Sequence, residues 1–319
     1  MPEQSFLDRF AFGIFQFIMR HGLLRTDDKV IVSVSGGVDS VCLLVLLDSF
    51  RIKIDFDLHV VHFHHGLRKE SDQEAEFVCQ LAKDRNIAFN LKKTDELSGK
   101  KGMQQKAREW RYQQLKMLQQ KHGCNKIALG HHLDDLVETQ IWRMIRGGSL
   151  FSFNPIQVKN LPYIRPLLNT SKEDLKRYLQ QQNQKWFDDI SNQKNDYTRN
   201  LIRNKIIPEM DKCAGGKLSE KLLNLNADAL HLKQLFEKQI PREQYETDSL
   251  EFEVISELNP LLGHELIHRY LLFHGQSEIT RVNIEKILQM VQSGKGNWSI
   301  ALKNGVTIRG LRKTLKISS

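Results

Sequence analysis

Long apolar segments are missing from this sequence of 319 residues. No run reaches the roughly 18 apolar residues that a membrane-spanning helix requires. The first twenty residues lack the basic head of a secretory signal peptide, and their apolar side chains recur at the spacing of an amphipathic helix. We therefore expect a cytoplasmic protein with no membrane partner.

Cysteine is scarce, and its spacing argues against several kinds of site. No two of the cysteines form a Cys-x-x-Cys pair, and all lie far apart: Cys42, Cys79, Cys124 and Cys213. This spacing disfavours a zinc site, an iron–sulfur cluster and a disulfide framework. It is typical of a protein that stays in a reducing compartment.

Acidic residues are too few to balance the basic ones, so the formal net charge is +9. The excess is clustered: residues 92–121 hold nine Lys or Arg against three acids, and residues 303–316 hold five basic residues and no acid. Clustering of this kind favours a polyanionic partner such as nucleic acid. A basic surface that serves only solubility is the alternative.

One short turn joins two apolar runs, and the rest of the chain is organised around it. Residues 29–34 are β-branched and of strand length, whereas residues 41–47 are rich in leucine and predict a helix. The turn between them reads Ser35-Gly36-Gly37-Val38-Asp39-Ser40. Glycines let the backbone approach a ligand closely, and the N–H groups at a helix start attract anions. The turn therefore predicts a site for a di- or triphosphate.

Asp39 distinguishes this turn from other phosphate loops. The Gly-Lys-[Ser/Thr] ending of the Walker loop and the Gly-x-Gly-x-x-Gly pattern of a dinucleotide site are both absent. A carboxylate beside phosphates is favourable when a divalent cation such as Mg²⁺ lies between them. The alternative is an ordinary Gly-Gly turn whose serine and aspartate side chains cap the helix.

Strand-like and helix-like segments alternate over the first half of the chain. Strands are expected at 29–34, 57–63, 87–91 and 126–130, with helices at 41–47, 71–85, 103–122 and 131–146. This alternation predicts an α/β fold with a doubly wound, mainly parallel sheet, whose ligands bind at the carboxyl ends of the strands. Residues 92–102 predict a mobile loop, and Thr170-Ser171-Lys172-Glu173 resembles a capping box at a helix start.

Pro208 and the glycines at 215 and 216 predict a domain boundary. The catalytic domain is then expected at 1–215, and a smaller, mostly helical C-terminal domain at 216–319. Within the second domain we expect helices at 217–239, 260–273 and 281–292, followed by β-like runs near 298–317.

A cluster of histidines and acids follows the predicted fourth strand. Its members are His131, His132, Asp134, Asp135 and Glu138. Acids three or four residues apart share one face of a helix, and such a carboxylate pair is a good site for a primary ammonium group. Two alternatives remain open: a metal site, although the histidine spacing is not that of a zinc motif, and simple stabilisation of the helix N-terminus.

Two pairs of arginines lie at helical spacing. Arg108 and Arg111 are three residues apart, and Arg199 and Arg203 are four apart. Each pair can hold phosphate groups on one face of a helix. A solvated basic face is the alternative for either pair.

The turn at 35–40 resembles the pyrophosphate loop of the N-type ATP pyrophosphatase superfamily, whose members adenylate a substrate. The whole ordered set of motifs over residues 30–208 is similar to the tRNA(Ile)-lysidine synthetase family. Besides the turn, matching stretches include His62-x-His64-His65-Gly66-Leu67-Arg68, Ala107-Arg108-x-x-Arg111-Tyr112, Gly130-His131-His132-x-Asp134-Asp135-x-x-Glu138-Thr139, Arg165-Pro166-Leu167-Leu168 and Tyr197-x-Arg199-Asn200-x-Ile202-Arg203. Beyond residue 215 the similarity is weak.

The resemblance implies an adenine nucleotide alpha hydrolase-like fold and a two-step reaction. ATP adenylates the wobble cytidine of tRNA(Ile) with the CAU anticodon, and the ε-amine of L-lysine then displaces AMP, which leaves lysidine, AMP and pyrophosphate as products. A C-terminal domain that contacts tRNA and a homodimer are further expectations.

The same resemblance implies roles for individual residues. Catalysis is expected from Asp39, Arg108, Asp135 and Glu138; ATP binding from Ser35, Gly36, Gly37, Val38, Asp39, Ser40 and Arg111, with Mg²⁺ on Asp39; lysine binding from His131, His132, Asp135 and Glu138; and tRNA or phosphate binding from Arg68, Arg199 and Arg203.

Two other functions compete with lysine ligation. An enzyme of the same superfamily that thiolates tRNA uses the same adenylation, but it needs catalytic cysteines, and the scattered cysteines here disfavour it. A non-catalytic RNA-binding module that retains the loop is the second alternative. The presence of Asp39, Asp135 and Glu138 argues against such a loss of activity.

Overall fold

The computed structural model describes residues 6–64, 70–94, 103–147, 153–187, 197–276, 279–302 and 305–318. The chain divides into two compact units, Met1–Ala229 and Leu230–Ser319, and the division falls within one continuous helix, α9 (Leu218–Gln239). The boundary predicted at residue 215 lies just before this helix. Arg68 and most of the loop predicted at 92–102 lie outside the described residues.

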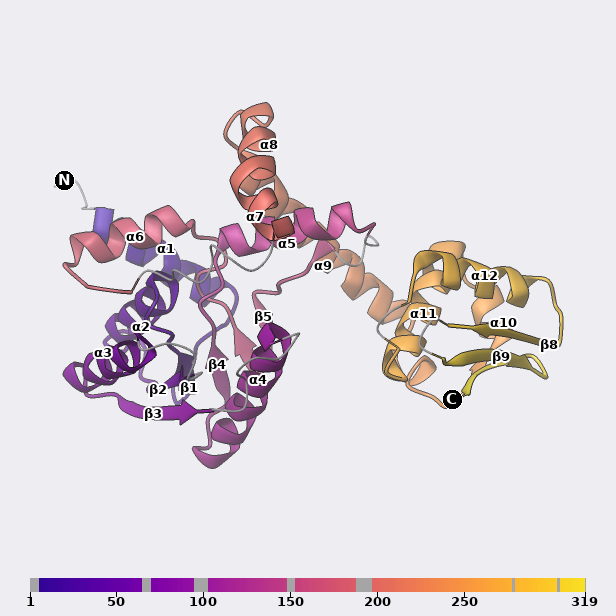
Figure 1. Cartoon of the computed structure of the whole chain (residues 1–319), viewed down its shortest axis with the longest axis horizontal. Coiled ribbons are helices and arrows are strands. Elements are labelled where there is room, and N and C mark those ends of the chain that lie inside the picture. The colour runs from indigo at the N-terminus through magenta and orange to yellow at the C-terminus, as the bar shows by residue number, and fades with distance from the viewer. Residues whose placement is uncertain are drawn as a thin grey trace. The chain divides into compact units, whose positions relative to one another are not determined.

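In the first unit, strands and helices alternate as the sequence predicts (Figure 1). The strands are β1 (Lys29–Ser33), β2 (Asp57–His64), β3 (Ala88–Lys93), β4 (Lys126–Ala128), β5 (Lys159–Asn160) and β6 (Tyr163–Ile164). The helices are α1 (Phe6–Arg20), α2 (Val38–Phe50), α3 (Glu70–Asp84), α4 (Met103–Lys121), α5 (Leu133–Ile145), α6 (Lys172–Gln181), α7 (Tyr197–Leu201), the π-helical turn η3 (Ile202–Ile206) and α8 (Ile207–Cys213).

The six strands form one sheet in the order β3-β2-β1-β4-β6-β5. All neighbouring pairs are parallel except β5 and β6, which are antiparallel. The central strand β1 places Val30 opposite Leu58 of β2 on one side and opposite Lys126 of β4 on the other. The prediction of a doubly wound, mainly parallel sheet is therefore confirmed.

Helices cover both faces of this sheet because successive residues of β1 are apolar on both sides. Val30 and Val32 belong to a core that also contains buried residues of α1, α2, α3 and α6. Ile31 belongs to a separate core, which it shares with Leu115 and Leu118 of α4. A strand buried on both faces is expected in a doubly wound sheet.

The topology brings three connections to one edge of the sheet. The turn at 35–40 follows β1, His131 follows β4, and Arg165 follows β6. Because these strands are adjacent and parallel, their carboxyl ends lie side by side. This edge is where ligands bind in open α/β sheets.

The second unit begins within α9 and contains an antiparallel sheet in the order β7-β10-β9-β8. Its other elements are η4 (Arg242–Gln244), β7 (Leu250–Glu251), α10 (Phe252–Ser256), α11 (Pro260–Phe273), α12 (Arg281–Gln292), β8 (Asn297–Ala301), β9 (Thr307–Leu311) and β10 (Thr314–Ser318). The predicted helices at 260–273 and 281–292 are present as α11 and α12. Across the described parts of both units, no helix combines the length and apolarity needed to cross a bilayer.

Candidate active site

The turn at 35–40 leaves the start of α2 open to a ligand. Gly36 has a φ of +95°, a left-handed conformation that glycine adopts without strain. Gly37 is the N-cap of α2 in an extended conformation, and no side-chain hydrogen bond caps the helix there. The Ser40 hydroxyl instead accepts from the backbone N–H of Ser35 at 3.1 Å and donates to the carbonyl of Gly37 at 3.0 Å. The first-turn N–H groups thus keep their attraction for an anion.

The end of β4 packs directly against this helix start. A Cβ atom added to Gly130 would lie 3.3 Å from the backbone of Asp39 and Ser40, so glycine permits the close approach. This contact places the residues that follow β4 beside the turn that follows β1.

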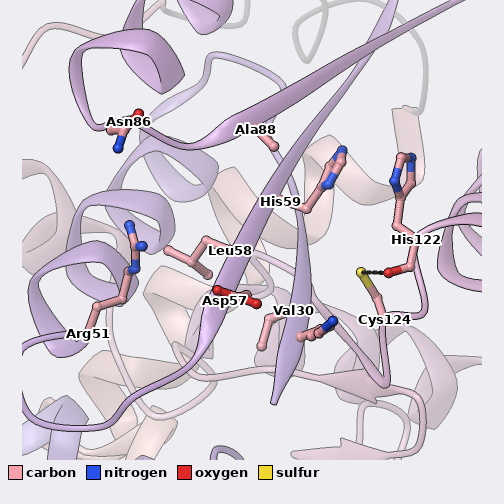
Figure 2. A pocket seen from close by; sticks show the side chains of 10 residues that line it. Val30, Arg51, Asp57, Leu58, His59, Asn86, Ala88, His122 and Cys124 are labelled. Carbon is pink, nitrogen blue, oxygen red and sulfur yellow. Dashed lines mark hydrogen bonds between the residues drawn. The ribbon is translucent and has the colours of Figure 1, made fainter. Parts of the chain in front are cut away.

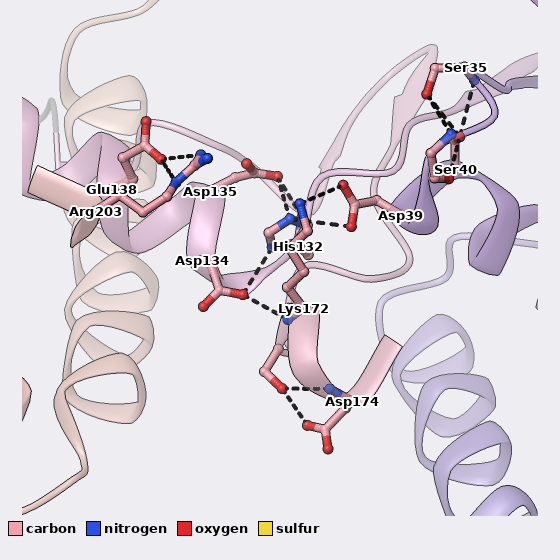
Figure 3. Close-up of polar contacts among 12 residues, drawn as sticks. Ser35, Asp39, Ser40, His132, Asp134, Asp135, Glu138, Lys172, Asp174 and Arg203 are labelled. Carbon is pink, nitrogen blue, oxygen red and sulfur yellow. Dashed lines mark hydrogen bonds and ion pairs between the residues drawn. The ribbon is translucent and has the colours of Figure 1, made fainter. Parts of the chain in front are cut away.

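His132 links the turn at 35–40 to the acids of α5 (Figure 3). Its Nε2 lies 3.6 Å from Asp39 Oδ1 and 3.5 Å from Asp135 Oδ2, and its Nδ1 lies 3.2 Å from Asp134 Oδ2. The backbone N–H of His132 also donates to Asp135 Oδ2 at 3.1 Å. The structure therefore brings the predicted residues Asp39, His132 and Asp135 into one cluster.

The three carboxylates hold His132 in its charged form. Burial alone would lower the pKa of His132, but the nearby carboxylates of Asp134 and Asp39 and the charge of Asp135 raise it to about 10. The pKa of Asp135 is raised, chiefly by burial and also by the charges of Asp39 and Glu138, although the charge of His132 opposes this. The cluster thus contains an imidazolium and a carboxylate of raised basicity.

Lys172, from the start of α6, adds a second cation. Its Nζ lies 3.8 Å from Asp39 Oδ2, and its backbone N–H donates to Asp134 Oδ2 at 2.7 Å. The side chain remains 38% exposed, so it can reach toward a ligand at the turn. The sequence indicated only a capping box here, and the cap observed is Ser171, which accepts from the backbone N–H of Asp174.

Glu138 lies in a different environment from Asp135. Arg203 donates to Glu138 Oε2 from Nε at 3.0 Å and from Nη2 at 2.6 Å, and Arg199 Nε lies 3.8 Å from Oε1. Glu138 is only 8% exposed, and Arg203 belongs to the π-helical turn η3, a kind of turn that is frequent at functional sites. The predicted lysine ligand and the predicted phosphate ligands are therefore paired with one another.

His131 points to a third environment, which is cationic. Arg165 Nε donates to His131 Nδ1 at 3.3 Å. Burial and the nearby charges of Arg165, Arg108 and Arg111 lower the pKa of His131 to about 3. Two adjacent histidines therefore carry different charges at neutral pH: His131 is neutral and His132 is an imidazolium.

A profile of the PP-loop domain family matches residues 9–210 of this chain. The chain belongs to the PP-loop family. The matched range contains all the strands of the first unit and every residue of the three environments described above.

Two relatives of this PP-loop protein are similar over most of its length. The tRNA(Ile)-lysidine synthase of Persephonella marina is 31% identical over 95% of this chain and 66% of its own length. That of Petrotoga mobilis is 29% identical over 90% of this chain and 93% of its own length. The chain thus spans about two thirds of the first relative. The resemblance inferred from the motifs is confirmed.

A solved structure supports the fold of the PP-loop protein. The U34-tRNA thiolase NcsA of Methanococcus maripaludis superposes with a TM-score of 0.61 and 17% identity, over 71% of this chain and 79% of the thiolase. At this identity the likeness concerns the fold alone, and it confirms the predicted fold class.

A separate pocket lies at the opposite edge of the PP-loop sheet, among the first residues of β1, β2 and β3 (Figure 2). The rings of His59 and His122 face one another there, with centroids 4.2 Å apart. Burial, and the proximity of His122, lower the pKa of His59. None of the predicted site residues lines this pocket. Those that the structure describes gather at the carboxyl edge of the sheet, which is therefore the candidate site.

The charge of His132 predicts a pH dependence of stability in the PP-loop protein. The pKa of His132 is higher in the folded chain than in the unfolded chain. Its contribution to the free energy of unfolding is therefore complete below about pH 6.5 and is lost as the pH rises toward 10. In chelator-treated protein, the difference in unfolding free energy between wild type and His132→Gln should shrink by about 2–4 kcal/mol between pH 6.5 and 10. Urea titrations at five pH values measure it, and a constant difference would contradict the assignment.

Lys172 supplies a second prediction. If its ammonium group assists phosphates bound at the turn, Lys172→Gln should lower the rate of ATP cleavage by about 10- to 100-fold. Lys176→Gln, an exposed lysine one turn later in α6, is the matched control and should stay within about twofold of wild type. Equal rates of ATP cleavage in the two variants would mean that Lys172 takes no part in that step.

Proposed function

We propose that this protein ligates L-lysine to C2 of the wobble cytidine of tRNA(Ile) with the CAU anticodon. ATP first adenylates the cytidine and releases pyrophosphate, and lysine then displaces AMP. The observation that carries the proposal is the juxtaposition of an uncapped phosphate turn with an acidic cluster through His132. The names of the two relatives, tRNA(Ile)-lysidine synthase, support the choice of substrates.

The phosphate turn suits the adenylation step. Cytidine O2 attacks the α-phosphorus of ATP, and the bond from that phosphorus to the bridging oxygen breaks. The departing pyrophosphate gathers negative charge beside the N–H groups of α2 and the ammonium group of Lys172. Preorganised donors of this kind stabilise the leaving group without having to reorient.

The residues at the turn also fit a magnesium ion carried by ATP. Asp39 Oδ1 is buried and faces His132 Nε2 at 3.6 Å, but it accepts no hydrogen bond from the described residues, so a lone pair stays available for a cation. Mg²⁺ is usually held by one or two carboxylates plus substrate phosphates, and a single carboxylate at the turn suits that pattern. Asp39 would hold the ion, which supplies charge neutralisation to the phosphates when bound.

The acidic cluster suits the lysine step. The ε-ammonium of lysine, with an ordinary pKa near 10.4, must lose a proton before it attacks C2. His132 is already protonated and cannot accept that proton, whereas Asp135 is a carboxylate whose pKa is raised. We therefore assign proton acceptance to Asp135, and ammonium binding to Asp135 and Glu138.

The remaining expectations are part of the same proposal. Residues 1–215 would carry catalysis and residues 216–319 would contact tRNA. In the second unit, exposed Arg309 of β9 pairs in register with exposed Lys316 of β10, and this basic pair suits RNA phosphates. The homodimer stays a prediction.

A single incubation tests the proposal. The protein is mixed with ATP, Mg²⁺, radiolabelled lysine and a transcript of tRNA(Ile) with the CAU anticodon, and the tRNA(Met) with the same anticodon is the control. We expect lysine in tRNA(Ile) alone, with AMP released in equal amount. AMP without lysine incorporation would contradict lysine as nucleophile, and sulfur transfer would be assayed next. Absence of both products would favour the RNA-binding module.

A further inference from the structure

Three arginines converge on one tyrosine beside the proposed active site. Arg108 Nη2 lies 3.5 Å from the Tyr112 hydroxyl, and the guanidinium carbons of Arg108 and Arg111 lie 5.3 and 5.9 Å from the centre of the Tyr112 ring. The edge of this ring meets Tyr163 of β6, with centroids 5.2 Å apart. Arg165, which follows β6, makes a side-chain hydrogen bond to Tyr112 and feels the charge of Arg108, so the three guanidinium groups lie together.

Arg165 is fixed in place by three further hydrogen bonds. Its backbone N–H donates to the carbonyl of Val158 at 2.9 Å, and its Nη1 donates to the carbonyl of Gln157 at 2.7 Å. Its Nε donates to His131 Nδ1 at 3.3 Å. Because Nδ1 of His131 accepts this bond, the single proton of the neutral imidazole must be on Nε2.

The guanidinium cluster has no counter-charge in the described part of the protein. No described carboxylate lies within 4.0 Å of Arg108, Arg111 or Arg165, in contrast to Arg203 and Arg269, which both form such pairs. Burial lowers the pKa of both Arg111 and Arg165. Arg111 and Arg165 are partly buried whereas Arg108 is exposed, and partly buried cations without an acid are unfavourable unless an anion binds beside them.

We propose that Arg108, Arg111, Arg165 and the Nε2–H group of His131 form a phosphate-binding subsite, and that Arg165 is the positioning residue that fixes the imidazole as a hydrogen-bond donor. Guanidinium forks and a neutral N–H donor match phosphate oxygens, whereas they repel the ammonium group of lysine. The subsite assigns His131 to the phosphate side of the reaction and not to the ε-ammonium group of lysine. It rests on the proposed function, because it lies beside the proposed active site.

The bound phosphate comes either from ATP or from the RNA backbone, and binding without turnover distinguishes the two. The variants are Arg165→Gln and Arg165→Lys, with Arg177→Gln, an exposed arginine of α6, as the control. Affinity for Mg²⁺-ATP is measured without RNA, and affinity for the tRNA transcript is measured without ATP between 50 and 200 mM salt. We expect Arg165→Gln to weaken one of the two about 10- to 100-fold, with Arg165→Lys intermediate because lysine lacks the planar fork.

The salt series and histidine NMR provide readouts that a purely structural arginine would not change. If the RNA backbone is the ligand, the slope of log affinity against log salt should fall by about one in Arg165→Gln. ¹⁵N spectra of histidine-labelled protein report the tautomer of each imidazole, and the His131 signals are those that disappear in His131→Gln. We expect His131 to be the Nε2–H tautomer in wild type and a mixture of both tautomers in Arg165→Gln. Unchanged affinity for both ligands, or an unchanged tautomer, would overturn the proposal.

The experiments distinguish a failure of the phosphate subsite from a failure of the proposed function. If Arg165→Gln loses phosphate binding while wild type makes no lysidine, the subsite stands and the function fails. If wild type makes lysidine and Arg165→Gln binds ATP and tRNA normally, the function stands and the subsite fails. Arg165→Lys keeps the test valid should Arg165→Gln not fold, as thermal melts will show.

Discussion

Asp39→Ala is expected to lower pyrophosphate release in the presence of ATP and tRNA by at least about 1,000-fold. Asp39 is the only acid of the turn at 35–40, and its Oδ1 lies buried without a hydrogen bond among the described residues. Its removal takes away the group that would hold Mg²⁺, and it also deprives His132 and Lys172 of their shared partner. Lys172 would then lose its carboxylate partner at the turn, and His132 would keep only Asp134 and Asp135.

A charge-neutral variant and a control on the same helix sharpen the test of Asp39. Asp39→Asn keeps the shape of the side chain, so a loss equal to that of alanine would show that the charge is what matters. Asp48→Asn, near the other end of α2, removes only contacts with Arg51 and Arg85 and should stay within about twofold of wild type. Retention of more than a tenth of wild-type activity by Asp39→Ala would remove Asp39 from the adenylation step.

Asp135→Asn is expected to separate the two halves of the reaction. The variant lacks the carboxylate that we propose as the proton acceptor for lysine, so lysine incorporation should fall about 100-fold, while adenylation should change by no more than about threefold. The α-phosphate of labelled ATP should then accumulate on tRNA as adenylated cytidine. Measuring the RNA-bound α-phosphate and RNA-bound lysine in the same samples gives both rates.

The matched control for Asp135 is Glu173→Gln, an exposed acid in the first turn of α6. It removes one negative charge from a helix start without touching the His132 cluster, so both rates should remain close to wild type. Equal losses of adenylation and lysine transfer in Asp135→Asn would mean that the residue acts in both steps, and undiminished lysine incorporation would rule it out as the acceptor.

Local sequence patterns were sufficient to predict β1 to β4 and the helices that follow them, α2 to α5. The β-branched run at 29–34, the Gly-Gly turn and the leucine-rich run after it each follow from the preferences of a few neighbouring residues. The placement of ligand-binding residues at the carboxyl edge of the sheet follows from the parallel order of the strands. For this reason the sequence places Asp39 and Asp135 at the same edge of the sheet, where both lie beside His132.

Contacts between distant segments could not be predicted in this way. Lys172 meets Asp39 across more than a hundred residues, and its neighbours in the sequence indicate only a helix start. Arg203 and Glu138 are 65 residues apart, and each looks like an independent ligand. His131 and His132 differ because side-chain direction at the end of β4 depends on packing, which the order of two identical residues does not reveal.

If lysine binds Glu138 as proposed, the pair between Glu138 and Arg203 makes that binding an exchange and not a simple addition. An incoming ammonium group can replace Arg203 at Glu138 Oε2 only in molecules where Arg203 has moved away, so the measured dissociation constant for that contact is the intrinsic one divided by the fraction of molecules in that open state. Each tenfold excess of the closed state weakens apparent affinity tenfold, or about 1.4 kcal/mol. Any partner that binds Arg203 preferentially would raise that fraction, and lysine would then bind more tightly with no new contact of its own.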